Sequence, residues 1–190
     1  MGKETRESSV RRRRARGAGF TLIEMLVSFS ALLIVLLGFS RMLLSSQMAS
    51  RTTHEATLAK EAARAQLEEL HGANFAEVYA RFNSDPNDDP GGDSPGAGFA
   101  IRGLEAPVGD ADGLPGVILF PEINGELRED VLQPQLFGTA LDLNGDGNAL
   151  GPDNLDHSND YRILPVVVRV EWRSSAGDGR VEFRSVIGSF

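Results

Sequence analysis

The 190-residue chain contains no cysteine, and its first proline is Pro86. Without cysteine, it can form neither disulfide bonds nor cysteine-based zinc sites. Without an early proline, a long N-terminal helix would carry no proline kink. Its histidines, His54, His71 and His157, are far apart, and no G-x-S-x-G, phosphate-binding-loop or H-E-x-x-H motif accompanies them. We therefore expect a protein that is not an enzyme.

Charge is divided unevenly along the chain. Residues 1–19 carry seven basic and two acidic side chains, whereas the remaining residues carry 12 basic and 25 acidic ones. An acidic body would repel nucleic acid, because duplex binding depends on Lys and Arg side chains that neutralise phosphates. We therefore expect no nucleic-acid partner, and we interpret the basic residues, including the run 11–14, as a signal for membrane orientation.

One apolar run, residues 20–40, is long enough to cross a bilayer. It has 21 residues, no proline and a single charge, Glu24. As a helix it would span roughly 31 Å, against about 30 Å for the hydrocarbon core. The basic residues before it predict a cytoplasmic N-terminus and a body on the other side of the membrane. The small residues 17–19 precede the run, so we expect any processing there and not after it.

Glu24 has an unusual position, because a carboxylate inside a spanning helix costs several kcal/mol unless it is paired or near the interface. If the chain were cleaved after Gly19, Glu24 would lie one turn from the new α-amine of Phe20. That amine would be largely cationic at neutral pH, since its ordinary pKa is about 8. Glu24 of one subunit could then pair with the Phe20 amine of a neighbour, which predicts an assembly of subunits.

The segment Gly19-Phe20-Thr21-Leu22-Ile23-Glu24, behind a basic leader, resembles the class III signal of type IV prepilins and pseudopilins. The resemblance implies cleavage after Gly19 by a prepilin peptidase, N-methylation of Phe20, and a role for Glu24 in assembly with other pilin-like subunits. It also implies a single-pass protein of the bacterial inner membrane, with a periplasmic head, that later enters a filament. The competing interpretation is an ordinary signal anchor with a chance glutamate.

Helical periodicity continues beyond the apolar run to about His71, with Gly72 as a candidate C-cap. Small or apolar residues recur there at steps of three or four, and they form one stripe: Met42, Ser45, Ala49, Thr52, Ala56, Ala59, Ala63, Leu67 and Leu70. We predict a single helix of roughly 50 residues whose second half lays this stripe against a sheet. A second, short helix is expected over residues 74–82.

The remaining residues predict a head of loops and short strands. Residues 83–98 are typical of a loop, and strands are expected at 99–104, 117–123, 126–131, 163–172 and 180–187. Asn124-Gly125 predicts a type I′ hairpin turn, and Pro121 is expected to interrupt the strand before it. The order of elements predicts an α+β fold, with a leader at 1–19, a transmembrane half-helix at 20–40, an exposed amphipathic half at 41–72 and a head at 73–190.

The Val-rich strand 163–172 and the strand that closes it look similar to the C-terminal hairpin of minor pseudopilins of the I type and minor pilins of the V type. Many pilins also carry a C-terminal disulfide, which this chain cannot form. Both features favour a minor subunit, and they are compatible with a pilus, a type II secretion pseudopilus and a DNA-uptake machine alike.

Residues 142–153 have oxygen donors at the spacing of a calcium loop. Loop positions 1, 3, 5, 7 and 12 are occupied by Asp142, Asn144, Asp146, Asn148 and Asp153, and Gly147 takes position 6. Hard oxygen donors select Ca²⁺ over softer metals. No helical pattern flanks the loop, and Asp153 stands where the usual ligand is a longer Glu, so Asp156 or Asp160 could replace it. The competing interpretation is an ordinary Asn/Asp/Gly turn.

Two functions are therefore open. The chain is either a filament subunit, whose activity is assembly, or a membrane-tethered module that binds calcium or another ligand through its head.

Overall fold

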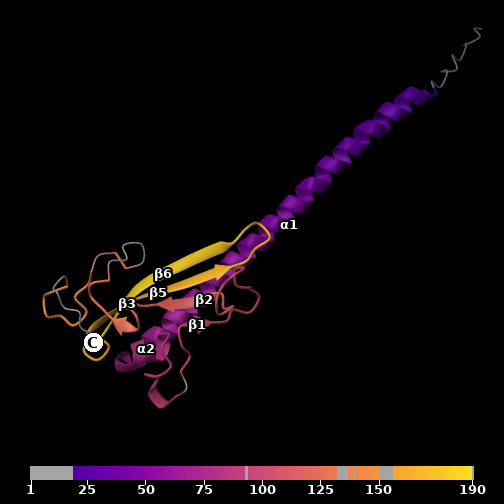
Figure 1. Cartoon of the computed structure of the whole chain (residues 1–190). Coiled ribbons are helices and arrows are strands. Elements are labelled where there is room, and N and C mark those ends of the chain that lie inside the picture. The colour runs from indigo at the N-terminus through magenta and orange to yellow at the C-terminus, as the bar shows by residue number, and fades with distance from the viewer. Residues whose placement is uncertain (1–18, 93, 132–136, 139, 150–155, 190) are drawn as a thin grey trace, which may run out of the picture. The chain divides into compact units, whose positions relative to one another are not determined.

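The structure is a computed structural model that describes residues 19–92, 94–131, 137–138, 140–149 and 156–189. The chain divides into two compact units between residues 45 and 46. Its elements, in chain order, are α1 (Leu22–Gly72), α2 (Phe75–Phe82), η1 (Pro90–Gly92), β1 (Gly98–Phe99), β2 (Gly116–Leu119), β3 (Glu122–Ile123), β4 (Glu126–Leu127), β5 (Ile163–Trp172) and β6 (Gly179–Gly188) (Figure 1). This is the predicted α+β architecture, with a long apolar N-terminal helix and a small antiparallel sheet.

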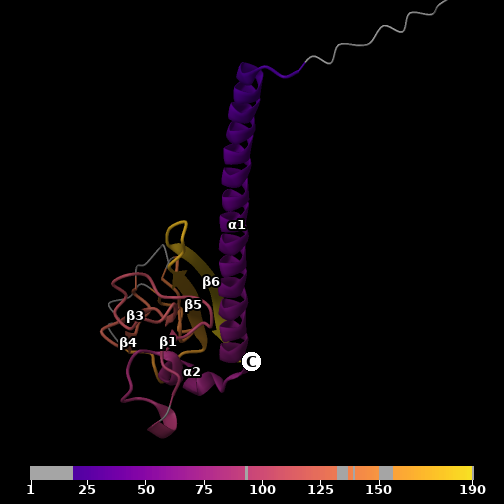
Figure 2. The same ribbon diagram turned by 90° about the vertical axis from the view of Figure 1, so that its right-hand side faces the viewer.

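The main sheet has the strand order β1-β2-β5-β6, and every neighbouring pair is antiparallel. β5 and β6 pair along their whole length, from Ile163 opposite Gly188 to Trp172 opposite Gly179. The two strands lie side by side in both views (Figures 1 and 2). The predicted C-terminal hairpin is therefore confirmed.

β3 and β4 form a separate two-stranded ribbon. The turn between them has positive φ at both Asn124 (55°) and Gly125 (82°), as a type I′ turn requires. Pro121 interrupts the predicted strand 117–123 and separates β2 from β3. The turn and the interruption are both as expected.

Two predicted strands are much shorter in the structure. The strand expected at 99–104 stops at Phe99, because the chain then turns: the Leu104 amide donates to the Ile101 carbonyl (3.2 Å) and Gly103 has a φ of 92°. The strand expected at 126–131 ends at Leu127. Its partner β3 is only two residues long and is preceded by Pro121, which has no N–H to extend the ladder.

The core of the second unit lies between the C-terminal part of α1 and one face of the sheet. Ala59, Ala63 and Leu70 are fully buried in one apolar cluster with alternate β5 residues such as Val168. The alanines leave room for the helix backbone to approach the strands. Figure 2 shows α1 alongside β6, where the Arg64 guanidinium lies 5.7 Å from the Phe183 ring centroid. The predicted stripe is thus confirmed over this part of α1.

Towards its N-terminal end the stripe is exposed, at Met42, Ser45 and Ala49. Burial begins at Thr52, and the helix ends at Gly72, one residue beyond the predicted limit. The length of 51 residues agrees with the expected single long helix.

The second helix, α2, closes the end of the core. Val78, Tyr79 and Phe82 are buried, as the predicted helix 74–82 requires. The Tyr79 hydroxyl donates to the Gly125 carbonyl (2.9 Å) and contacts Glu122 Oε2 (3.2 Å). Burial, together with the neighbouring Glu122 carboxylate, raises the pKa of Tyr79 well above its usual value. Tyr79 therefore stays protonated and ties α2 to the β3–β4 turn.

The opposite face of the β5–β6 hairpin carries charged residues. Arg169 Nε lies 2.7 Å from Glu182 Oε1, and Arg180 donates to the same oxygen. Burial acts to raise the pKa of Glu182, but hydrogen bonds from Arg180 and Arg169 outweigh it and hold the pKa below its usual value.

We expect Glu182→Gln to lower the stability of the fold at neutral pH and to lower it less in acid. A carboxylate whose pKa is lowered by folding stabilises the protein above its unfolded pKa of 4.5, and this contribution is lost as pH falls through the folded pKa. Because the pair is only partly buried, the deficit should be about 1 kcal/mol or less at pH 7. Urea unfolding of the wild-type and variant chains at about pH 7 and about pH 2.5 measures it.

Glu105→Gln is the matched control, because Glu105 is exposed and should change the stability at neither pH. A Glu182→Gln deficit of the same size at both pH values would contradict the assignment of a lowered pKa.

Candidate functional site

The N-terminal segment enters the helix through a capping residue. The Thr21 carbonyl accepts the Met25 amide (3.1 Å), and Thr21 Oγ1 accepts the Glu24 amide (3.3 Å). Thr21 is therefore the N-cap of α1, and Glu24 lies in its first turn, as in a T-x-x-E capping sequence. A carboxylate is favourable there, because a helix N-terminus carries partial positive charge. Gly19 and Phe20 precede the cap and are exposed.

The described part of the first unit, residues 19–45, presents a largely apolar surface. Phe20 is 78% exposed and Leu22 84%, and the large apolar side chains that follow as far as Leu44 are exposed as well. By length and composition α1 can cross a membrane. Apolar surface of this extent calls for lipid or for apolar partner helices around it. Glu24 is the one charged residue in the apolar run 20–40.

The backbone of the predicted calcium loop folds around the side chain of Asp142, its first residue. The Asp142 carboxylate accepts the amides of Gly145 (2.6 Å), Asp146 (3.1 Å) and Gly147 (2.7 Å). Asn144 Oδ1 accepts the Asp146 amide, and Asp146 Oδ1 accepts the Asn148 amide. The structure thus brings four of the five predicted ligand residues into one loop. The fifth, Asp153, lies outside the described residues.

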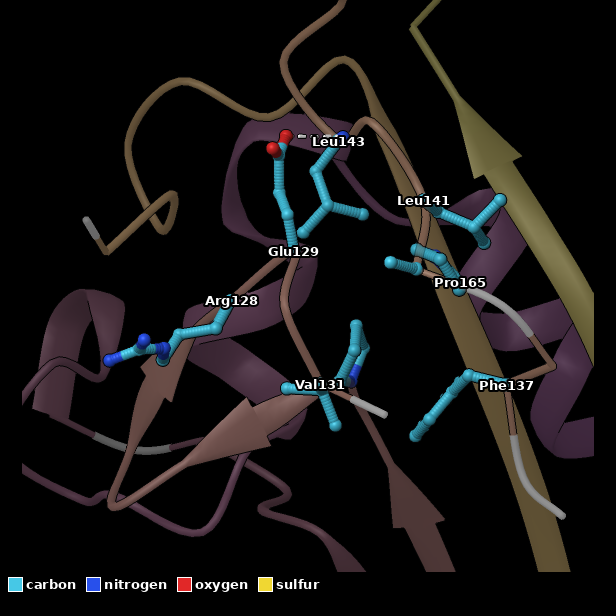
Figure 3. A pocket seen from close by; sticks show the side chains of 9 residues that line it. Arg128, Glu129, Val131, Phe137, Leu141, Leu143 and Pro165 are labelled. Carbon is cyan, nitrogen blue, oxygen red and sulfur yellow. Dashed lines mark hydrogen bonds between the residues drawn. The ribbon is translucent and has the colours of Figure 1, made fainter. Parts of the chain in front are cut away.

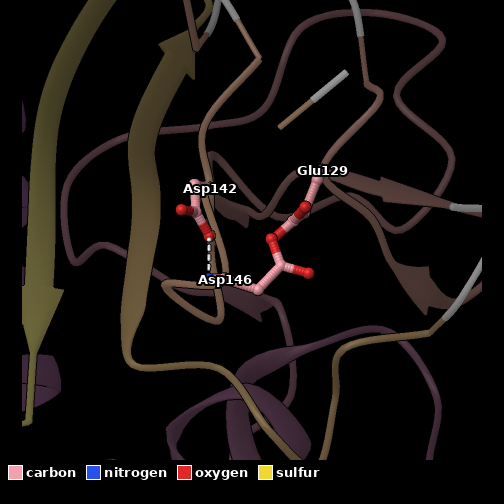
Figure 4. Close-up of side chains that lie close together, drawn as sticks. All are labelled: Glu129, Asp142 and Asp146. Carbon is pink, nitrogen blue, oxygen red and sulfur yellow. Dashed lines mark hydrogen bonds between the residues drawn. The ribbon is translucent and has the colours of Figure 1, made fainter. Parts of the chain in front are cut away.

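A further carboxylate, Glu129, lies beside this loop. One carboxylate oxygen from each of Glu129, Asp142 and Asp146 lies within 4.8 Å of the others, and the three side chains converge in Figure 4. Glu129 is only 3% exposed. Its Oε1 accepts the amides of Leu143 (2.6 Å) and Asn144 (3.2 Å), so it also holds the start of the loop in place.

The other oxygen, Glu129 Oε2, is buried and has no hydrogen-bond partner among the described residues. The nearest basic group is His157 Nε2, at 4.0 Å, and His157 is charged only when protonated. Sequence reasoning missed Glu129, although a signal existed. Within the predicted strand 126–131, Glu129 shares the two-residue period of Leu127 and Val131, and all three are buried.

The two predicted substitutes for Asp153 have other partners, although Asp160 Oδ2 still contacts the loop at Asn144 Nδ2 (3.5 Å). Asp156 Oδ1 accepts the amides of Leu127 and Ser158, both at 3.0 Å. Asp160 Oδ1 lies 3.0 Å from His157 Nδ1. Neither belongs to the three-carboxylate cluster of Glu129, Asp142 and Asp146.

A small cavity lies between Glu129 and the sheet (Figure 3). Its lining is mostly apolar and consists of Pro121, Arg128, Glu129, Val131, Phe137, Ala140, Leu141, Leu143 and Pro165. Its volume of about 10 Å³ offers space for about one water molecule, and therefore none for an organic ligand.

Comparison with known proteins identifies the N-terminal segment. Residues 14–40 match a family model described as the prokaryotic N-terminal methylation motif. The matched residues include Gly19, Phe20, Glu24 and the apolar run. No curated protein and no solved structure matches the chain.

Proposed function

We propose that this chain, which its N-terminal motif makes a type IV prepilin-like protein, is a minor subunit of a type IV pilus or of a type II secretion pseudopilus. The observation that carries the proposal is the match of residues 14–40 to the methylation motif, on a helix whose apolar side chains are exposed. Pilin-like proteins are structural subunits, so the activity proposed for this chain is assembly.

In this proposal a prepilin peptidase cleaves after Gly19, and Phe20 becomes the methylated N-terminus. The basic residues before the apolar run support a cytoplasmic leader, with the head in the periplasm. The apolar half of α1 anchors the subunit in the inner membrane until it enters a filament with other pilin-like subunits.

A minor role is supported by two features of the head. The chain has no cysteine and so cannot form the C-terminal disulfide of many major pilins. Its sheet ends in the long β5–β6 hairpin that resembles those of I-type minor pseudopilins and V-type minor pilins.

Mass spectrometry of the N-terminus tests the processing step. From membranes of cells with an active prepilin peptidase, we expect a chain that begins at Phe20 and carries one added methyl group. Gly19→Val should leave the chain with its Met1 terminus, because a branched side chain replaces the small residue at the cleavage point. Gly17→Ala, two residues upstream, should be processed normally. An intact Met1 terminus in the wild-type chain would refute the proposal.

A second candidate function is a membrane-tethered calcium-binding module that keeps a prepilin-like anchor. The cluster of Glu129, Asp142 and Asp146 favours it. Such a module would need the apolar run for anchoring but not the pairing of Glu24 with a neighbouring subunit, so substitution of Glu24 distinguishes the two functions.

A further inference from the structure

We propose that Glu129, Asp142 and Asp146 bind a calcium ion, with Glu129 supplying the strong carboxylate ligand that calcium loops usually take from their twelfth position. The site would fasten loop 140–149 to the segment that follows β4. This inference concerns the head alone and does not depend on processing or assembly.

The burial of Glu129 supports a bound cation. A buried carboxylate is costly unless each oxygen finds a hydrogen bond or a cation. Glu129 Oε1 has two backbone amide donors, but Oε2 has none among the described residues. The two amide donors therefore satisfy Oε1 and leave Oε2 without a hydrogen bond, in a side chain that is clustered with two more carboxylates.

The Lys and Arg side chains of the described residues do not account for this charge. Arg128 pairs with Glu126 (3.6 Å) and Asp130 (2.7 Å), both outside the cluster. Within the part of the chain that the structure describes, no Lys or Arg forms an ion pair with any of the three carboxylates. His157 Nδ1 lies 3.0 Å from Asp160 Oδ1, and His157 Nε2, which is also buried without a hydrogen-bond partner among the described residues, lies 4.0 Å from Glu129 Oε2. His157 compensates the Glu129 charge only when its ring is protonated, and 4.0 Å is longer than a hydrogen bond. A bound cation would supply the missing charge.

The spacing of the oxygens suits calcium. Oxygen ligands lie at about 2.3–2.6 Å from Ca²⁺, so two of them can be up to about 5 Å apart across the ion. The three carboxylate oxygens here lie within 4.8 Å of one another. All are hard donors, which select Ca²⁺ over transition metals.

The site also has an entry path. Glu129 is buried, Asp142 is half-buried and Asp146 is exposed, so the cluster opens to solvent on the Asp146 side. Water can enter there and complete the coordination shell. The loop is already folded, with Gly145 (φ 78°) and Gly147 (φ 90°) in conformations that side chains oppose, so binding would need little rearrangement.

Calorimetric titration of the full chain, in detergent and stripped of metal, with CaCl₂ tests the site. We expect one Ca²⁺ per chain, with a dissociation constant of about 0.1–1 mM as in extracellular modules, and a calcium-dependent rise in the melting temperature of the head. Glu129→Gln should abolish both effects, while its amide oxygen can still accept the Leu143 amide. Asp146→Asn should abolish them too, and because Asp146 is exposed this change spares the fold.

Two controls separate this site from its alternatives. Glu126→Gln removes a nearby exposed carboxylate and should leave calcium binding within about twofold of wild type. Asp153→Asn should also bind, because the proposed site does not use the twelfth loop position. Absence of heat and of any melting shift at about 10 mM Ca²⁺, tenfold above the upper expected constant, would overturn the proposal. So would calcium binding that Glu129→Gln leaves intact, whether or not Asp153→Asn removes it.

Discussion

Glu24→Gln should leave the chain anchored in the membrane but exclude it from filaments. Glutamine has nearly the same size and keeps the helix start at Thr21 intact, but it removes the negative charge that would face the Phe20 amine of a neighbour. Leaving one member of a buried ion pair without its partner costs about 3–5 kcal/mol, which corresponds to at least about a 100-fold loss of association at each such contact. The reduction in filament incorporation should therefore be close to complete.

The measurement compares sheared filaments and membranes, by immunoblot, from cells with the full assembly machinery. Glu61→Gln is the matched control, because Glu61 is exposed on the same helix and lies outside the apolar run. It should enter filaments like the wild-type chain. Equal incorporation of the Glu24→Gln chain would contradict the proposed pairing and would favour the membrane-tethered calcium module.

Leu70→Ala should strongly destabilise the head. Leu70 is fully buried near the C-terminal end of α1, in the cluster that joins the helix to β5. Truncating a buried leucine removes apolar contacts and leaves a cavity, at a cost of about 2–5 kcal/mol. Since small domains are stable by only about 5–15 kcal/mol, this change removes a large fraction of the total.

Leu43→Ala is the matched control on the same helix. Leu43 is 48% exposed and belongs to the first unit, so its truncation should not alter unfolding of the head. Urea unfolding in detergent, followed by the fluorescence of Trp172, measures both variants. A Leu70→Ala midpoint equal to that of Leu43→Ala would show that α1 does not contribute to the core as the structure indicates.

Glu24 lies in the apolar half of α1, and Leu70 lies in the half that packs against the sheet. The role proposed for Glu24 rests on a short motif and on the cost of a charge in an apolar run, both of which can be recognised in the sequence. The role of Leu70 follows from helical periodicity, and the structure confirms it by burying the stripe from Thr52 onwards.

The amino-acid sequence by itself determined the elements that depend on local patterns. The length and apolarity of residues 20–40 predicted the anchor, and the three- and four-residue steps predicted α1. The β-branched residues of 163–172 predicted β5, and alternating apolar and charged residues predicted β6. Asn124-Gly125 predicted the turn between β3 and β4, because few other residue pairs adopt positive φ at both central positions of a turn. Each of these signals lies within one segment and needs no knowledge of its neighbours.

Only the tertiary structure decided which segments meet. β4 is short because its partner β3 has only two residues, and β1 is short because the chain turns away near Gly103. Glu129 joins Asp142 and Asp146 through packing of the segment after β4 against a loop more than ten residues later. The two-residue periodicity could place Glu129 on the inner face of its segment. Periodicity could not predict which side chains Glu129 would contact there. Contacts between distant segments depend on how the whole head packs, and no local pattern encodes that.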